Sequence, residues 1–205
     1  MAGGVTACDV LVVGAGPGGG NAALQCVRQG LHTMLIEDHS EIGTPVHCGE
    51  CISDLACESL DLDLPDHVIS KRVHGIRVIF PDGTEKRLTE EGYVLEKHLF
   101  ERWIADEAVA AGASVHLSHK LSSMKRVENG RFAGWLCDGK GEHLPIQAKI
   151  VIDASGVAAV CSKTVELEKG VPLNTMGKVV AGMQYEMLEV PTDGYLDFYI
   201  WPKYA

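Results

Sequence analysis

An apolar run meets a glycine-rich turn at VLVVGAGPGGG, residues 10–20. The apolar residues predict a buried parallel strand, and the alanine-rich segment after the turn predicts a helix that ends near Gly30. In such a unit Gly14 permits the tight turn, Gly16 lets the backbone approach a pyrophosphate, and Gly19 permits close packing of helix on strand. The stretch therefore predicts the start of a Rossmann-type α/β fold that binds a dinucleotide. We assign six positions of the turn to the cofactor site: Gly14, Ala15, Gly16, Pro17, Gly18 and Gly19.

A second predicted strand, residues 32–37, ends in an acidic pair. At this place in a dinucleotide fold, Glu37 would accept hydrogen bonds from a ribose hydroxyl and would repel a 2′-phosphate. The residue therefore disfavours NADP, and we assign both Glu37 and Asp38 to the cofactor site. The alternative is a glycine-rich turn without a ligand, which the strand, helix and Glu37 in register argue against.

The composition is ordinary for a soluble globular protein, with 46% hydrophobic and 22% charged residues. A formal charge of -10 and the lack of a basic stripe argue against a nucleic-acid partner. The 7 cysteines are scattered, which suits reduced thiols better than a disulfide framework, and no apolar run is long enough to span a bilayer. We therefore expect a cytoplasmic protein, for which peripheral membrane contact remains open.

Local patterns predict further elements along the chain. Ser53 suits the N-cap of a short helix, and segments 75–80 and 85–90 flank a turn, as in a hairpin. Apolar residues at three- and four-residue spacing predict a helix over 97–112. A strand over 114–118 follows, and short strands joined by tight turns then predict a β-meander: 121–127, 131–137 and 147–153.

The meander and the strand that ends in Asp153-Ala154-Ser155-Gly156 are similar to those of FAD-dependent oxidoreductases, whereas an NAD domain continues with further βα units. FAD is favoured over NAD, and Ser155 and Gly156 join the cofactor site. Alternation over 177–201 predicts the first strands of another, antiparallel sheet. We expect a Rossmann-type FAD-binding domain with a β-meander over 1–173, and the start of an antiparallel β substrate domain over 174–205, both incomplete.

The loop Glu41-Ile-Gly-Thr-Pro-Val-His-Cys-Gly-Glu50 resembles the EIGxPVxCGE loop of archaeal-type geranylgeranyl reductases, the family of digeranylgeranylglycerophospholipid reductase. Similar stretches follow in the same order, so the resemblance covers nearly the whole chain: residues 93–96, 112–113, 152–156, 183–185 and 197–199. A second FAD loop of GDA type, which follows in that family, is not within this sequence.

The resemblance implies an FAD-dependent reductase that saturates carbon–carbon double bonds in the geranylgeranyl chains of membrane lipid precursors. Reduced flavin would deliver hydride and a proton source would complete each addition. The implied partners are an isoprenoid lipid substrate and an external electron donor whose identity the sequence does not give.

The resemblance also implies roles for residues outside the glycine turn. By it, His47, Cys48, Gly49 and Glu50 lie where the loop passes the flavin, with Cys48 as the catalytic residue. Lys97 would open the helix that approaches the cofactor, and Leu121 would meet the adenine through its backbone. The family commonly has arginine in place of Lys97 and glycine in place of Cys51.

Three other functions remain open. Cys48 and Cys51 are a CxxC pair after the second strand, as in a flavin-linked thiol–disulfide oxidoreductase, although those enzymes space the pair more widely. An FAD-dependent hydroxylase of the aromatic type shares the general fold, and a nucleotide-binding fragment without turnover is the third alternative. We expect no metal site, because a single CxxC lacks a second ligand pair.

Overall fold

The structure is a computed structural model that describes residues 5–46, 48–161, 165–166, 182, 184–185 and 190–200. The chain divides into two compact units. The first unit comprises Met1–Pro45 and Phe100–Ala181, and the second comprises Val46–Leu99 and Gly182–Ala205. Each unit is described by itself.

The first unit is built on the predicted strand-turn-helix. Strand β1 (Thr6–Val13) leads through the glycine turn into helix α1 (Pro17–Arg28), and the chain returns as β2 (Thr33–Ile36). Strand β2 lies parallel between β1 and β8 (Ser114–His116). This arrangement confirms the predicted Rossmann-type unit.

The predicted meander consists of β9 (Lys120–Arg126), β10 (Phe132–Cys137) and β11 (His143–Asp153). It belongs to a seven-stranded sheet of order β12-β9-β10-β11-β1-β2-β8, in which β12 is Val165–Glu166. The long strand β11 pairs antiparallel with β10 and parallel with β1, so the last strand of the meander is also a strand of the parallel sheet.

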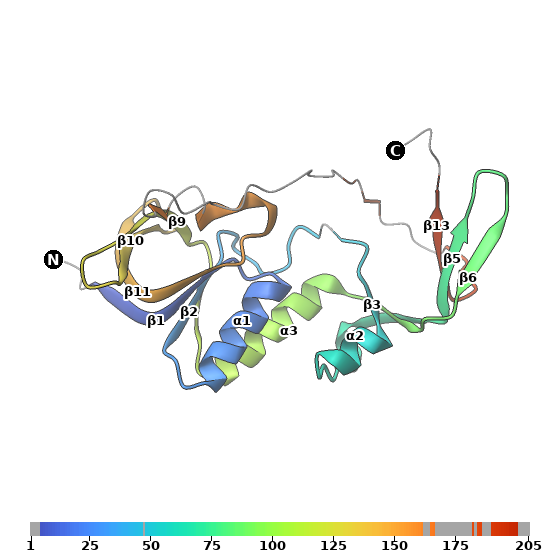
Figure 1. The fold of residues 1–205 in the computed structure, drawn as a ribbon, viewed down its shortest axis with the longest axis horizontal. Helices are drawn as coiled ribbons and strands as arrows, with labels where there is room; N and C mark the ends of the chain where they lie inside the picture. Colours follow the sequence, from blue (N-terminus) through green and yellow to red (C-terminus); the bar gives the residue numbers. More distant parts are fainter. Residues whose placement is uncertain are drawn as a thin grey trace. The chain divides into compact units, whose positions relative to one another are not determined.

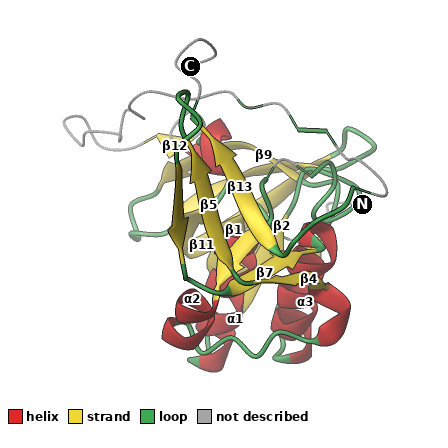
Figure 2. Cartoon of the chain, turned by 90° about the vertical axis from the view of Figure 1, so that its right-hand side faces the viewer, coloured by secondary structure: helices red, strands yellow, loops and turns green. Residues whose placement is uncertain are grey.

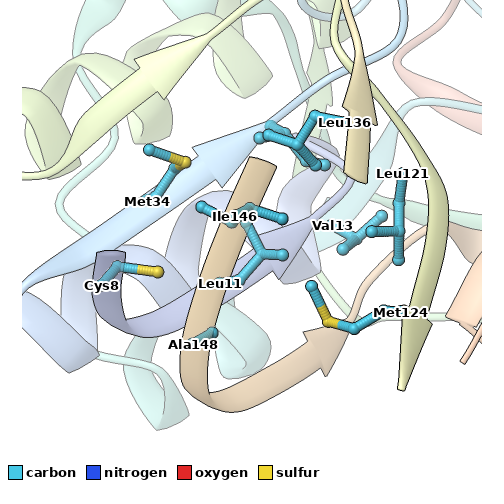
Figure 3. Packing of buried hydrophobic residues seen from close by; sticks show 10 residues of the cluster. Cys8, Leu11, Val13, Met34, Leu121, Met124, Leu136, Ile146 and Ala148 are labelled. Atoms are coloured by element: carbon cyan, nitrogen blue, oxygen red, sulfur yellow. The ribbon is translucent and has the colours of Figure 1, made fainter. Parts of the chain in front are cut away.

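The two faces of this sheet have separate cores. On one face, residues of β1 and β2 pack with α1 and with α3 (Lys97–Ala110), which lie side by side (Figure 1). On the other face the core is formed with the meander, and Figure 3 shows the side chains of this core. Its members are Cys8, Leu11, Val13, Met34, Ile36, Leu121, Met124, Leu136, Ile146 and Ala148.

In the described part of the chain, no helix has the length and apolar character needed to cross a membrane.

The second unit contains two small sheets. One has the order β3-β7-β4, formed by Cys51–Ser53, Gly92–Leu95 and Ile69–Val73. A short helix, α2 (Asp54–Ser59), follows β3, and a 3-10 turn (Asp66–Val68) precedes β4. The sequence prediction placed the cap of α2 correctly, because the Ser53 hydroxyl accepts the Ala56 N–H at 3.2 Å.

The other sheet of the second unit has the order β13-β5-β6. The predicted hairpin is confirmed as β5 (Gly75–Ile79) and β6 (Glu85–Leu88), and β13 (Tyr195–Tyr199) lies beside β5 (Figure 2). The sheet is mixed, because β13 pairs with β5 in parallel while β5 and β6 are antiparallel.

The predicted boundary between residues 173 and 174 falls outside the described residues, as does most of the strand expected from residue 177, so both remain predictions. The second unit also contains residues 46–99, which the sequence prediction includes in the first domain.

Candidate functional site

The glycine turn packs tightly on one side and is open on the other. Gly14 has φ +98°, and a Cβ there would lie 2.6 Å from the carbonyl oxygen of Ala154. A Cβ on Gly19 would overlap the carbonyl oxygen of Gly14, so both positions need glycine for packing. By contrast, a Cβ on Gly16 or Gly18 would meet no atom within 4 Å. The open side is therefore formed by Gly16 and Gly18.

This open side fits a pyrophosphate. Gly16 is the N-cap of α1 and Pro17 is in its first turn, so no side-chain cap occupies the start of the helix. The first N–H groups of a helix have no partner within it, and the helix dipole favours an anion at this end. Because Gly16 carries no side chain, a phosphate could approach the backbone directly. The chain thus has the features that the phosphates of FAD require.

Glu37 lies directly after β2 and joins the glycine turn to the following loop. Its Oε2 accepts the backbone N–H of Ala15 at 2.7 Å. Its Oε1 accepts the backbone N–H of His39 at 3.1 Å and lies 2.6 Å from Nδ1 of the same histidine. A carboxylate has roughly four acceptor positions, so Oε2 retains capacity for a ribose hydroxyl.

The hydrogen bonds to Glu37 also fix its charge. Burial disfavours the ionised carboxylate, but the donors at Ala15 and His39 outweigh it, so the pKa of Glu37 is lowered. The pKa of His39 is raised, mainly by its hydrogen bond to Glu37 and further by Asp38, whose Oδ1 lies 3.1 Å from Nδ1. Glu37 is therefore an ionised acceptor at neutral pH.

The segment after β11 lies against the same turn. Asp153 organises it, because its carboxylate accepts the N–H of Ser155 at 3.1 Å, the Ser155 hydroxyl, and the N–H of Cys161 at 3.0 Å. Gly156 begins a 3-10 turn, Gly156–Ala158, with φ +58°. The structure thus brings Ser155 and the glycine turn together, while their contacts to FAD remain predictions.

Asp38 and Leu121, two other predicted site residues of the first unit, differ in solvent exposure. Asp38 is exposed beside Glu37. Leu121 is almost fully buried, and its side chain belongs to the core that strands β1 and β2 form with the meander strands. Its predicted backbone contact with adenine remains a prediction.

In the second unit, the structure describes Cys48, Gly49 and Glu50, whereas His47 lies outside the described residues. Glu50 fastens this loop to the segment before α3. Its backbone has φ +60°. Its carbonyl oxygen accepts the N–H of Leu95 at 2.7 Å, and its carboxylate accepts the N–H of Lys97 at 3.3 Å. Glu50 therefore has a structural contact that the sequence prediction did not include, and it brings the loop to the start of α3.

The two thiols of the loop face opposite edges of one peptide group. The N–H of Glu50 donates to Cys48 Sγ at 3.4 Å, and Cys51 Sγ donates to the carbonyl oxygen of Gly49 at 2.8 Å. In a trans peptide, the N–H and C=O point in opposite directions. Burial raises the pKa of Cys51, with further increases from Cys48 and Glu50. This arrangement gives no support to a preformed Cys48–Cys51 disulfide.

Sequence reasoning missed two residues that organise the site. Asp153 could have been found as a carboxylate at a strand end directly before a Ser-Gly turn. Little in the sequence marks His39 as a site residue, because a lone histidine in a loop is usually solvated. Its contact with Glu37 depends on the conformation of the loop.

The comparisons with known proteins agree with this geometry. Residues 9–199 match the family described as FAD dependent oxidoreductase, which confirms FAD as the expected cofactor. The chain is 37% identical over 201 residues to digeranylgeranylglycerophospholipid reductase of Thermoplasma acidophilum, covering 94% of this chain and 50% of that protein. A digeranylgeranylglycerophospholipid reductase from Methanothrix thermoacetophila is 39% identical over 156 residues, covering 73% of this chain and 39% of the relative.

Among solved structures, a geranylgeranyl bacteriochlorophyll reductase-like protein from Thermoplasma acidophilum matches with a TM-score of 0.80 and 32% identity, covering 97% of this chain and 51% of that one. An aklavinone-11 hydroxylase in complex with FAD and aklavinone matches with a TM-score of 0.62 at 18% identity, covering 76% of this chain and 34% of that one, which shows the fold alone. The chain spans about half the length of the curated relatives that it matches over its full extent. These findings confirm the predicted fold class and the family resemblance.

Proposed function

Because the chain belongs to the FAD-dependent oxidoreductase family, we propose that the protein reduces carbon–carbon double bonds in geranylgeranyl chains of isoprenoid lipid precursors. The observation that carries this proposal is the 37% identity to a digeranylgeranylglycerophospholipid reductase across 94% of the chain. An identity this high over both units extends beyond the dinucleotide fold, which many unrelated oxidoreductases share.

The residues of the chain would hold and orient the reactants. Bound FAD would supply the hydride chemistry. The open side of the glycine turn would hold its pyrophosphate, and Glu37 would accept a ribose hydroxyl. On the loop of the second unit, Cys48 and Gly49 would lie near the reacting ring, and Glu50 would hold that loop to the start of α3 at Lys97. Because isolated alkenes resist hydride attack, a well-placed proton donor is also required.

The protein would act in the cytoplasm and contact the membrane peripherally, since its substrate would be a lipid. Its electrons would come from an external donor. Co-sedimentation of the flavin-loaded protein with phospholipid vesicles tests the membrane contact; protein that stays in the supernatant at every lipid concentration would contradict it.

The reaction is tested with the purified protein, dithionite-reduced under anaerobic conditions and mixed with digeranylgeranylglycerophospholipid. We expect the lipid to gain the mass of one H₂ for each double bond reduced, together with reoxidation of the flavin. Free reduced FAD without protein is the control for uncatalysed reduction. A lipid of unchanged mass with protein that holds FAD would contradict the proposed reaction while leaving the cofactor assignment intact.

A further inference from the structure

His39 lies between two carboxylates at the end of β2. Its Nδ1 is 2.6 Å from Glu37 Oε1 and 3.1 Å from Asp38 Oδ1, and its backbone N–H also donates to Glu37. Glu37 is largely buried, with 12% of its side chain exposed, whereas 57% of the His39 side chain is exposed. The exposed histidine thus lies against one oxygen of a largely buried side chain.

The loop that carries His39 is itself fixed by backbone hydrogen bonds. The carbonyl oxygen of His39 accepts the N–H of Ser118 at 2.9 Å. The backbone of Glu37 donates to the carbonyl of His116 at 2.9 Å and accepts the N–H of His119 at 2.8 Å. These bonds hold the main chain of the loop, and the contact of Nδ1 with Glu37 Oε1 then places the His39 ring.

The two carboxylate oxygens of Glu37 have different hydrogen-bond partners. Both donors from His39 meet Oε1, while Oε2 meets Ala15 of the glycine turn. A ribose hydroxyl would therefore approach the side of Oε2, next to the residues that would hold the pyrophosphate. Without His39, the carboxylate could rotate and use Oε1 for other donors.

We propose that His39 is a positioning residue, which orients Glu37 toward the ribose of FAD and makes the affinity for FAD depend on pH through its own protonation. When protonated, His39 donates to Glu37 and offsets the charges of Glu37 and Asp38. Neutral His39 can still donate from Nδ1 to Glu37, but it no longer carries a positive charge, so the charges of the two carboxylates lie uncompensated near the negatively charged pyrophosphate. The proposal rests on FAD as the cofactor and does not depend on the substrate.

The direction of the pH dependence follows from these contacts. The raised pKa of His39 extends its protonated form to higher pH than in a free histidine. FAD affinity is therefore greatest below this pKa and falls as the pH rises through it. The titratable groups near His39 are Glu37 and Asp38 on its own segment; across from it, the rings of His116 and His119 lie 5.3 Å apart, and burial lowers the pKa of His116.

The test measures the Kd of FAD by quenching of flavin fluorescence from about pH 6 to about pH 9, the range in which histidines titrate. The protein is first stripped of flavin. We expect unaltered protein to lose affinity as the pH rises. His39→Gln keeps a donor but cannot titrate, so its Kd should be roughly three- to tenfold higher at low pH and nearly independent of pH. His32→Gln, at an exposed histidine before β2, is the matched control and should behave like the unaltered protein.

The outcomes separate the inference from the cofactor assignment. An identical pH profile in His39→Gln and unaltered protein would overturn the role of His39. A higher Kd in His39→Gln that still changes with pH would overturn it as well. Unaltered protein that binds no FAD at any pH would contradict the cofactor itself.

Discussion

The backbone N–H of Ala15 donates to Glu37 Oε2 at 2.7 Å. This bond joins the turn that would hold the phosphates of FAD to the carboxylate that would hold its ribose. The two parts of the nucleotide site are therefore set relative to each other before a ligand arrives, which reduces the ordering cost of binding.

Glu37→Arg should remove most of the FAD from the purified protein, because it replaces a ribose acceptor with a bulky cation and breaks the bond to Ala15. We expect at least roughly tenfold weaker binding. The measurement is the ratio of the flavin absorbance at about 450 nm to protein. Glu128→Arg makes the same charge change at an exposed turn and should leave FAD bound. Stoichiometric FAD in Glu37→Arg would refute the assignment of Glu37.

Two glycines of the same turn should respond differently to alanine. A Cβ on Gly19 would overlap the Gly14 carbonyl, so Gly19→Ala should lower the free energy of unfolding by roughly 3 kcal/mol. A Cβ on Gly16 meets open space, so Gly16→Ala should fold normally but bind FAD poorly, since its methyl group would occupy the approach of the pyrophosphate. Urea unfolding and FAD titration distinguish the two effects.

Gly18→Ala serves as the stability control for Gly19→Ala, because its Cβ meets open space and alanine is the better helix former. It should be at least as stable as the unaltered protein. A Gly19→Ala variant as stable as Gly18→Ala would show that the turn can relax, and would contradict the packing argument.

Much of the first unit could be predicted, because local pattern determines it. The apolar run, the glycines and Glu37 have fixed spacing in a dinucleotide fold. Strand β3 could not be predicted in this way. It spans only Cys51–Ser53 and is stabilised by pairing with β7, which is far away in the sequence. The pairing of β13 with β5 could not be predicted either, because the two strands are far apart in the sequence.

As in the fold, only those parts of the candidate site that depend on local sequence pattern could be predicted. Residues of the glycine turn were identified from backbone requirements, which sequence reveals directly. The contacts of His39 and Asp153 arise from loop conformation. The hydrogen bonds that Glu50 accepts from Leu95 and Lys97 join segments that are far apart in the sequence. Such contacts depend on tertiary structure and leave little local signal.

Ser53→Ala should destabilise the second unit by about 1 kcal/mol, because it removes the N-cap acceptor for the Ala56 N–H of α2. The control is Ser59→Ala at the other end of the helix, where the exposed hydroxyl donates to the Ala56 carbonyl. Since alanine also favours helix, this change should stay within about 0.5 kcal/mol. Equal unfolding free energies for the two variants would argue against the cap.

Alkylation should distinguish the thiols at about pH 8, because the thiolate is the reactive form. Burial raises the pKa of Cys8 to about 11 and that of Cys161 to about 12, in both cases with a further increase from a neighbouring aspartate. Cys51 also has a raised pKa. We expect iodoacetamide to label the exposed Cys48 first, with labelling of Cys51 increasing as the pH rises. Peptide mass spectrometry measures the order, unfolded protein is the control, and faster labelling of Cys51 would contradict it.

Cys48 should affect alkene reduction, whereas Cys51 should be dispensable. Both lie on one short loop, but only Cys48 matches the PVxCGE pattern, and their thiols face opposite edges of the Gly49–Glu50 peptide. A disulfide would require both of these hydrogen bonds to break, because each holds its thiol at a different edge of the peptide. We therefore expect Cys48→Ala to reduce turnover and Cys51→Gly to retain it. Mass measurement of hydrogens added to a geranylgeranyl lipid, with FAD content as a control, tests both variants.

Turnover in Cys48→Ala equal to that of the unaltered protein would show that the role of the loop is structural only. Loss of turnover in Cys51→Gly alone, with a reversible Cys48–Cys51 disulfide in the unaltered protein, would favour a thiol–disulfide oxidoreductase instead.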